Sequence, residues 1–432
     1  MQNKSKLAWG AGLAAALTII LATSLMSRAG VGANVSAGIG GSGARGMSFL
    51  QHEAPYNKSV LSKQLGTAIK INEYPESFSF FVDGAVKKAK VAYTLHEPSQ
   101  AMMQKLMGQY KPDYGAFVAM DAKTGRILSM VSYSNAKRDP ENLTLRATFP
   151  SASIFKVVTA SAAIDLNKAN SGTVVPFNGA FHTLYKRNVE STKETRWTTH
   201  ITMKEAFARS VNTFFSKLGL FYVGPRNLEL YAERYFFNHE IRADVPVQIG
   251  HAKIDEDDPW GVASAASGYT RDNTMSPLQG ALIAAAVAND GIMMEPFLVD
   301  SLHDEAGDML YRGEPHQASV VVEPQAAEDL RELFQQTVRS GTSRKSFRKT
   351  VRRASFDDVE FGGKTGSLMG IDPIGKCDWF VGYARYRDQR IAVAALTVNE
   401  KKWKVKSSML ANLFFQRYMH DLKQREALAD AK

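Results

Sequence analysis

Residues 149–160 read FPSASIFKVVTA, and we expect the fold to be organised around this stretch. A proline and small residues, followed by apolar residues at helical spacing, predict a loop that turns into a buried helix from Ser153 to about Leu166. Ser153 and Lys156 are one helical turn apart, so their side chains lie on one face of that helix. A lysine held neutral there could accept the proton of the serine hydroxyl, which is the SxxK arrangement of serine acyl-transfer enzymes.

The SxxK spacing is weak evidence when it stands alone. It recurs at Ser134/Lys137 and at Ser346/Lys349, and a Lys-Thr-Gly triplet occurs early in the chain at residues 123–125. The chemistry therefore has to be supported by further motifs in a definite order.

Composition sets the outer bounds of the interpretation. The 432 residues are 44% hydrophobic and 22% charged, which predicts a globular protein with room for about two or three domains. A net charge of +10 suits an anionic partner such as an acidic lipid surface or wall polymer, and no nucleic-acid motif favours nucleic acid. The single cysteine, Cys377, excludes a disulfide within the chain.

The N-terminal stretch Leu7–Met26 carries no charge and follows Lys4 and Lys6. About 20 residues at about 1.5 Å each span one bilayer core. Positive charge before the segment predicts a single-pass anchor of the cytoplasmic membrane, with the N-terminus in the cytoplasm and the remaining chain periplasmic or extracellular. A cleaved signal peptide is the alternative, because Ser27 and Ala29 form a loose cleavage pattern.

Beyond the anchor, the composition changes twice. A stretch of Gly, Ala and Ser cannot bury a core and predicts a flexible tether. Short alternating runs follow, in which Ser77–Val82 and Lys90–Thr94 could pair around an Asp83-Gly84 turn. The expected organisation is a cytoplasmic tip and anchor (1–28), a linker (29–46), a small platform (47–97) and the main domain (98–428).

The main domain is predicted to be α+β, with a central antiparallel sheet flanked by helices and accompanied by a helical subdomain. Residues 339–353 carry seven basic side chains, which indicate a solvated loop or, alternatively, a basic lip for an anionic ligand. The expected strands are Gly115–Asp121, Arg126–Ser134, Phe361–Met369, Asp378–Tyr386 and Arg390–Val398. The expected helices, besides the one at Ser153, are Ala101–Tyr110, Met203–Leu218, Asn273–Asp290, Ala326–Val338 and Ser407–Ala427.

Three motifs follow one another along the chain. Ser153-Ile-Phe-Lys156 comes first, Ser210-Val-Asn212 second and Lys364-Thr-Gly366 third, and the Ser-x-Asn pattern occurs once. They are expected on a helix start, a helical segment and a strand, respectively.

With these motifs the chain resembles the penicillin-binding proteins, in their transpeptidase domain, over roughly residues 90–425. The likeness extends to the hairpin Ala116–Val131, to Thr274-Met-Ser-Pro-Leu-Gln279, to Gly363-Lys-Thr-Gly-Ser367 and to Asp378-Trp-Phe-Val-Gly-Tyr383. The resemblance implies the serine D,D-peptidase and β-lactamase fold, and a monofunctional, class B-like member, since the segment before the main domain leaves no room for a glycosyltransferase domain. It also implies D-Ala-D-Ala stem peptides of peptidoglycan as substrate and covalent inhibition by β-lactam antibiotics.

The resemblance assigns a role to each motif residue. Ser153 is implied to be the nucleophile that forms the acyl-enzyme, and Lys156 its general base. Burial and a second lysine nearby would lower the pKa of Lys156. Ser210 is implied to relay a proton to the departing amine, and Asn212 to hold Lys156 and a substrate amide.

The third motif is implied to bind substrate. Lys364 would supply fixed positive charge, and Thr365 a hydroxyl, for the terminal carboxylate. Gly366 would let the substrate backbone approach the strand. The backbone N–H groups of Ser153 and Ser367 would form the oxyanion hole. The family needs no metal or organic cofactor, and family analogy suggests a membrane glycan polymerase or other wall-synthesis proteins as partners.

Other functions remain open at this stage. A D,D-carboxypeptidase would use water as acceptor in place of an amine. A β-lactamase would hydrolyse its acyl-enzyme quickly, but no Glu between Asn212 and Lys364 has the Asn four residues later that class A enzymes use. A penicillin-sensing or scaffolding module without catalysis is the alternative from a different class. One departure from the family pattern is Ala152, at a position where many members have glycine.

Overall fold

The structure, a computed structural model, describes residues 58–69, 71–82, 85–135 and 141–430. The expected anchor (Leu7–Met26), the linker (29–46) and the Asp83-Gly84 turn lie outside these residues. Within the described ranges, no helix combines the length and apolar character needed to cross a bilayer.

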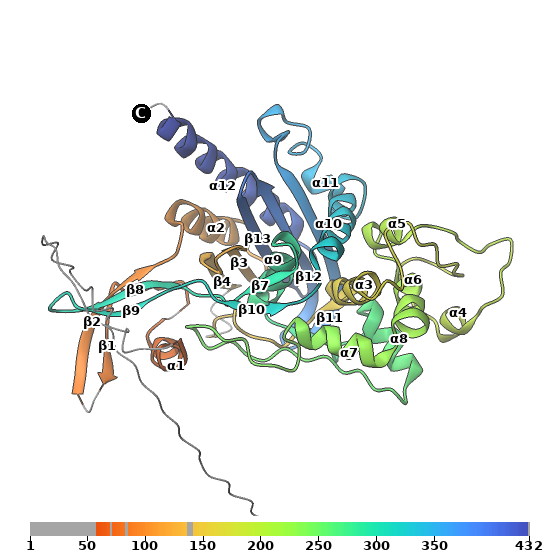
Figure 1. Cartoon of the computed structure of the whole chain (residues 1–432), viewed down its shortest axis with the longest axis horizontal. Coiled ribbons are helices and arrows are strands. Elements are labelled where there is room, and N and C mark those ends of the chain that lie inside the picture. Colours follow the sequence, from red (N-terminus) through yellow and green to blue (C-terminus); the bar gives the residue numbers. More distant parts are fainter. Residues whose placement is uncertain (1–57, 70, 83–84, 136–140, 431–432) are drawn as a thin grey trace, which may run out of the picture. The chain divides into compact units, whose positions relative to one another are not determined.

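A five-stranded sheet forms the centre of the described residues (Figure 1). Every neighbouring pair in it is antiparallel, and the strands of the early hairpin join the three late strands. The predicted α+β fold with a central antiparallel sheet is therefore confirmed. In spatial order the strands are β11 (Glu360–Ile371), β12 (Ile374–Tyr386), β13 (Gln389–Asn399), β3 (Tyr114–Asp121) and β4 (Ile127–Ser134).

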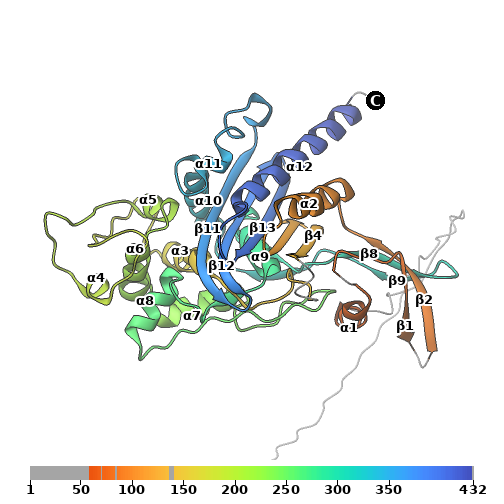
Figure 2. The same ribbon diagram turned by 180° about the vertical axis from the view of Figure 1, so that it is seen from behind.

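Helices cover both faces of this sheet. Because strand side chains alternate, Trp379 of β12 joins one buried cluster and Phe380 joins the other. The first cluster contains α9 (Pro277–Ala288), and the second contains side chains of α2 (Glu97–Tyr110) and α12 (Ser407–Asp430). Figure 2 shows α2 and α12 side by side on their face. The result is a three-layer arrangement with two hydrophobic cores.

Helix α9 packs closely on the sheet because its residues are small. All of its residues are buried, and the Ser276 hydroxyl caps its N-terminus by accepting a backbone hydrogen bond. A Cβ added at Gly280 would lie 3.2 Å from the Val381 side chain and 3.3 Å from Ala394. The close approach of helix and sheet therefore depends on the missing side chain at residue 280.

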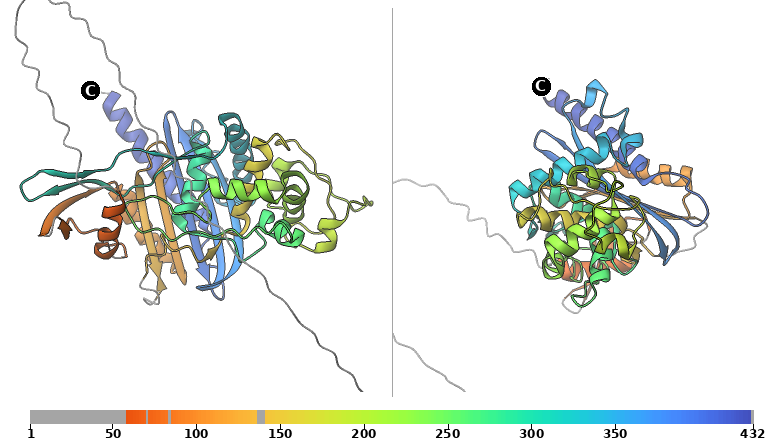
Figure 3. Two further views of the ribbon diagram at one scale, coloured as in Figure 1. Left: turned by 60° about the horizontal axis from the view of Figure 1, so that its bottom comes forward. Right: turned by 90° about the vertical axis from the view of Figure 1, so that its right-hand side faces the viewer.

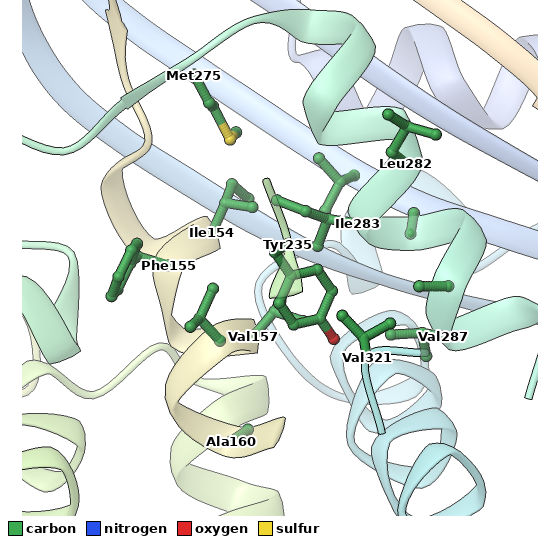
Figure 4. Packing of buried hydrophobic residues seen from close by; sticks show 14 of the residues in the cluster. Ile154, Phe155, Val157, Ala160, Tyr235, Met275, Leu282, Ile283, Val287 and Val321 are labelled. Atoms are coloured by element: carbon green, nitrogen blue, oxygen red, sulfur yellow. The ribbon is translucent and has the colours of Figure 1, made fainter. Parts of the chain in front are cut away.

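The helix that carries Lys156 is held in the same core. The chain forms a 3₁₀ turn, η2 (Ala152–Phe155), and then α3 (Lys156–Asp165). Figure 4 shows Val157 of α3 near Tyr235, in the buried cluster that also contains Ile283 and Val287 of α9. The sequence predicted one helix from Ser153, whereas Ser153 lies in the preceding 3₁₀ turn. The cause is Ala152, whose positive φ of 48° starts a tight turn and not a regular helix.

The helical subdomain lies beside the β11 end of the sheet (Figure 3). The predicted helix Met203–Leu218 is wrong as one element, because Ser210 has a positive φ of 58° and separates two short helices. A Thr202/Glu205 capping box starts the first of them. The elements are α4 (Lys186–Glu190), α5 (Met203–Ala208), α6 (Asn212–Lys217), the π-helical turn η3 (Leu218–Val223), α7 (Pro225–Arg234) and α8 (Pro259–Ser267).

The small platform draws on two distant parts of the chain. The expected strands near residues 77–94 pair antiparallel, but two strands near residue 300 complete their sheet, in the order β1-β2-β8-β9. Two strands that follow residue 97 in the chain thus complete the sheet of the predicted platform. Its elements are α1 (Lys58–Ala68), β1 (Ser77–Val82), β2 (Ala85–Tyr93), β8 (Val299–Asp304) and β9 (Met309–Arg312).

Buried charges join this platform to the main domain. Lys58 of α1 forms an ion pair of 2.8 Å with Glu295, and both side chains are almost fully buried. The Asp244 carboxylate is buried and accepts the backbone N–H groups of Leu298 and Val299 at 2.8 to 2.9 Å. Burial raises the pKa of Asp244 to about 6.

The basic stretch 339–353 contains a short helix, and most of its basic side chains are exposed, as a solvated segment predicts. Phe347 of its short helix is buried in the second core. The remaining elements of the main domain are β5 (Phe149–Pro150), β6 (Thr274–Met275), β7 (Ile292–Met294), β10 (Gln317–Val320), α10 (Pro324–Arg339), α11 (Arg344–Phe347) and the 3₁₀ turn η4 (Ala354–Phe356).

The packing of α9 can be tested with a pair of matched substitutions. Gly280→Val should lower the free energy of unfolding by about 1–3 kcal/mol, because the new side chain meets β12 and β13. Gly108→Val in α2 adds the same side chain where nothing lies within 4 Å, and it should change stability by less than about 0.5 kcal/mol. Urea unfolding followed by tryptophan fluorescence measures both, and equal effects would contradict this account of α9.

Candidate active site

Ser153 and Lys156 are in direct contact. The Lys156 Nζ lies 2.8 Å from the Ser153 Oγ and 2.8 Å from the Asn212 Oδ1, and it also donates to the Ser267 carbonyl. The amide oxygen and the carbonyl are acceptors only. A neutral amine has two hydrogens, which these two acceptors take, so its lone pair is left for the serine hydroxyl. The geometry thus prepares Lys156 to accept the Ser153 proton.

The charge state of Lys156 follows from its surroundings. Its side chain is fully buried at 0% exposure, and burial lowers its pKa well below the ordinary value of a lysine. The positive charge of Lys364 lowers it further. The sequence predicted both causes. Burial and the nearby charge thus both favour the neutral form of Lys156.

The residues of the second motif, Ser210 and Asn212, contact the two buried lysines. Ser210 lies in the tight turn between α5 and α6, and its Oγ is 2.9 Å from the Lys364 Nζ. Asn212 starts α6, and besides accepting from Lys156 it donates its side-chain amide to the His182 carbonyl at 2.9 Å. The left-handed backbone at Ser210 is strained for a residue other than glycine, which is common at functional sites.

The third motif lies on β11, the outermost strand of the sheet. Lys364 is fully buried, and its Nζ donates to the carbonyl of Thr365 at 2.7 Å. Burial lowers the pKa of Lys364 to about 7. Its charge is therefore pH-dependent near neutrality, in contrast to the fixed charge expected from the sequence.

Gly366 allows β11 to approach the 3₁₀ turn η2, which carries Ser153. A Cβ at this position would lie 3.2 Å from the backbone nitrogen of Ser153 and 3.2 Å from the Ile154 side chain. A larger residue would push the strand away from the serine. Gly268 makes a similar approach, since its Cβ would be 1.8 Å from the carbonyl oxygen of Ala152.

The motif residues surround one cleft of about 520 Å³. Six of the eight predicted site residues line it, whereas Lys156 and Lys364 lie buried behind its wall. All eight are therefore brought together by the fold. The residues lining the cleft are Ser153, His182, Ser210, Asn212, Gly268, Tyr269, Thr342, Lys345, Ser346, Thr365, Gly366, Ser367, Lys376, Asp378, Trp379, Lys406 and Ser408.

Sequence reasoning missed several of these lining residues. His182 and Tyr269 lie in irregular connections whose positions no periodicity predicts. Lys345 belongs to the basic stretch 339–353, so the alternative of a basic lip describes part of that stretch better than a solvated loop. Lys376 follows the tip of the late hairpin, where a polar residue carries no signal of its own.

The described residues contain no group of three or more His, Cys, Asp or Glu side chains placed to hold a metal ion. Cys377 is buried beside the cleft, and burial raises the pKa of its thiol to about 12. A buried thiol with a raised pKa is a poor nucleophile at neutral pH.

Comparison with protein families decides the identity of this domain. Residues 115–420 match the model of the penicillin binding protein transpeptidase domain, which is more than half of the chain. The chain belongs to this family. The match covers all three motifs and the five strands of the central sheet except the first residue of β3.

Curated relatives include two mycobacterial proteins named peptidoglycan D,D-transpeptidase PbpA. The protein of Mycolicibacterium smegmatis is 28% identical over 317 residues, which is 66% of this chain and 62% of the relative. The protein of Mycobacterium tuberculosis is 27% identical over 324 residues, or 68% of this chain and 63% of the relative. The matched part thus spans less than two thirds of these relatives.

Solved structures show the same fold. Penicillin-binding protein A of M. tuberculosis, as a ceftriaxone acyl-enzyme complex, has a TM-score of 0.62 and 25% identity, covering 77% of this chain and 79% of that one. Penicillin-binding protein 3 of M. tuberculosis, complexed with aztreonam, has a TM-score of 0.65 at 20% identity, covering 80% and 82%. The transpeptidase fold therefore persists although most residues differ.

The two buried lysines predict a bell-shaped pH dependence for acylation by benzylpenicillin. The second-order rate constant should fall at low pH, where Lys156 takes up a proton and can no longer act as a base. It should fall again above pH about 7, where Lys364 loses the proton that attracts the penicillin carboxylate. Stopped-flow acylation from pH 5 to 9 measures both limbs.

The variant Lys364→Arg is the control for the alkaline limb, because a guanidinium stays charged over this range. Its profile should be level above pH 7, whatever its maximal rate. A profile of the unchanged chain that is level from pH 7 to 9 would contradict the assignment to Lys364.

Proposed function

We propose that this chain is a serine D,D-transpeptidase that cross-links the D-Ala-D-Ala stem peptides of peptidoglycan and is covalently inhibited by β-lactams. The contact that carries the proposal is that of the buried Lys156 Nζ with the Ser153 hydroxyl at 2.8 Å. Two further groups, which can only accept hydrogen bonds, bind the hydrogens of this amine. The names of the mycobacterial relatives and the acyl-enzyme complex of a structural neighbour support the same chemistry.

The acylation step follows from this geometry. The Ser153 Oγ attacks the carbonyl carbon of the penultimate D-alanine while its proton passes to the Lys156 Nζ. The backbone N–H groups of Ser153 and Ser367 stabilise the oxyanion. The C–N bond to the terminal D-alanine then breaks. The proton on Lys156 then passes through the Ser210 hydroxyl to the departing amine, so Lys156 is neutral again. The carboxylate of the departing D-alanine is bound by the charge of Lys364.

Transfer to the acceptor reverses the same steps. The amine of a second stem peptide attacks the ester carbonyl of the acyl-enzyme and loses a proton to the neutral Lys156. The ester bond breaks, Ser153 recovers its proton and a new amide bond links the two peptides. Asn212 keeps Lys156 oriented through both steps by the 2.8 Å contact.

The cleft supports transfer to an amine over rapid hydrolysis. Among the described residues that line it, Asp378 is the one carboxylate. Its two oxygens accept from the Lys406 ammonium at 3.0 Å and from the Ser407 N–H at 2.9 Å. Both oxygens of this carboxylate are thus already engaged by donors of the protein. This observation argues against a β-lactamase.

Labelling of the full chain with a fluorescent penicillin tests the proposal. An adduct should form, persist for hours and be absent in Ser153→Ala. Lys156→Met should slow labelling by a factor of about 10² to 10⁴, because the serine loses its general base. Rapid loss of the adduct with repeated turnover would indicate a β-lactamase, and no adduct at all would contradict the serine mechanism.

A second assay separates the acceptors. With acetyl-lysyl-D-Ala-D-Ala and an excess of D-amino acid, a transpeptidase should give the exchanged peptide, whereas a D,D-carboxypeptidase should give free D-alanine alone. Ser153→Ala should give neither product.

We also propose that Leu7–Met26 anchors the chain in the cytoplasmic membrane, with the catalytic domain outside and a membrane glycan polymerase as partner. The support is the uncharged length of this segment and the lysines before it. Carbonate washing of membranes should leave the chain in the pellet, and Ile20→Arg should weaken this retention. An intact mass that lacks the first residues would show a cleaved signal peptide and contradict the anchor.

A further inference from the structure

Arg271 lies at the free edge of strand β11. It follows α8 by four residues, beyond the turn at Gly268, and its Nε donates to the carbonyl of Met369 at 3.0 Å. Gly268 and Tyr269, in the same connection, line the cleft. The guanidinium is therefore held against the strand that forms one wall of the active site.

The direction of the neighbouring carbonyl groups shows where a ligand would lie. Backbone groups two residues apart in a strand point to the same side. The carbonyls of Thr365 and Met369 accept from the side chains of Lys364 and Arg271, respectively, and so point out of the ladder with β12. The carbonyl of Ser367 between them must point to the same free edge. No side chain of the described residues donates to it.

Of these three carbonyls, that of Ser367 is the one left to accept a hydrogen bond from an extended ligand. The terminal carboxylate belongs near Thr365 and the reacting carbonyl near Ser367, so the preceding residue of the peptide runs toward Met369. At a rise of about 3.4 Å per residue, Met369 lies about 7 Å further along the strand than Ser367. The Met369 carbonyl already accepts a hydrogen bond from Arg271, so at this point the ligand contacts the Arg271 guanidinium and not the backbone carbonyl.

The guanidinium has capacity for an anion. Its Nε–H is used by Met369, but a guanidinium carries five N–H donors, and a carboxylate fits two of them side by side. Arg271 is exposed, and no carboxylate of the described residues lies within ion-pair distance of it. Three lysines and one aspartate line the adjoining cleft, so the surroundings are positively charged as well.

We propose that Arg271 is a specificity residue that binds a free carboxylate on the side chain of the residue preceding D-Ala-D-Ala. The inference rests on the proposed transpeptidase function and adds the class of its donor peptide. The third residue of this peptide carries a free side-chain carboxylate, and peptides in which an amide replaces this carboxylate are disfavoured. The bond to Met369 fixes the guanidinium, so little rotational freedom is lost when the carboxylate binds.

Two penicillins that differ by one carboxylate provide the test. Carbenicillin carries this group on the acyl side chain, at the place of the preceding residue, and benzylpenicillin lacks it. For the full chain, the ratio of the acylation rate constants of carbenicillin and benzylpenicillin should fall about tenfold in Arg271→Met, as expected for loss of a charge-assisted hydrogen bond. In Arg271→Lys the ratio should lie between those of the unchanged chain and Arg271→Met. Lysine keeps the positive charge but cannot bind a carboxylate through two parallel N–H groups.

Lys376→Met is the matched control, because it removes one positive charge from the same cleft without touching the Met369 carbonyl. It should change the ratio less than about twofold. A ratio unchanged in Arg271→Met, or lowered equally in both variants, would overturn the assignment and leave the transpeptidase function intact. Failure of the unchanged chain to react with either penicillin would remove both proposals.

The same comparison with peptides checks the natural ligand class. Acetyl-Glu-D-Ala-D-Ala and its isosteric amide acetyl-Gln-D-Ala-D-Ala differ by charge alone. The unchanged chain should release D-alanine from the glutamyl peptide faster, and Arg271→Met should remove most of this preference. An equal rate for both peptides in the unchanged chain would overturn the proposal.

Discussion

The burial of an amine beside a serine is the constraint on which this structure depends. Lys156 has no contact with solvent, and an uncompensated ammonium in such a place is costly. The protein meets this cost in two ways: Asn212 and Ser267 supply acceptors, and burial with a neighbouring charge makes the neutral form available. Each acceptor comes from a different helix of the subdomain. Two helices around α3, α6 and α8, thus each supply one hydrogen-bond acceptor to the Lys156 Nζ.

The edge of the sheet supplies the other half of the site. Strand β11 pairs with β12 on one side and contacts the 3₁₀ turn η2 on the other, so the free backbone groups of β11 face Ser153. Close approach is possible because Gly366 and Gly268 have no side chain where the turn passes. The Trp379 indole adds a further constraint by donating to the carbonyl of Pro150 at 2.9 Å, just before the turn. The site is thus positioned by core contacts as much as by its own polar groups.

Much of this arrangement could be predicted from the sequence, and the limits have physical causes. The motif residues, the hairpin and the three late strands have strong local patterns, and the structure places them as expected within a few residues. The turn at Ser210 was missed because positive φ at a serine carries no signal in a helical pattern. The position of Arg271 depends on a bond to a strand 98 residues away, which local patterns do not encode. The pKa of Lys364 depends on burial that appears only in the folded chain.

The composition of the platform has a consequence for synthesis of the chain. Strands β1 and β2 leave the ribosome long before β8 and β9, and the Lys58–Glu295 contact spans 237 positions. Closing such a long loop is entropically costly and slow, so the early hairpin waits with one edge unpaired. An unpaired edge invites association with other chains until its partner strand arrives. Synthesis of this protein would thus require that its first folded unit be kept from aggregating until most of the polypeptide has followed.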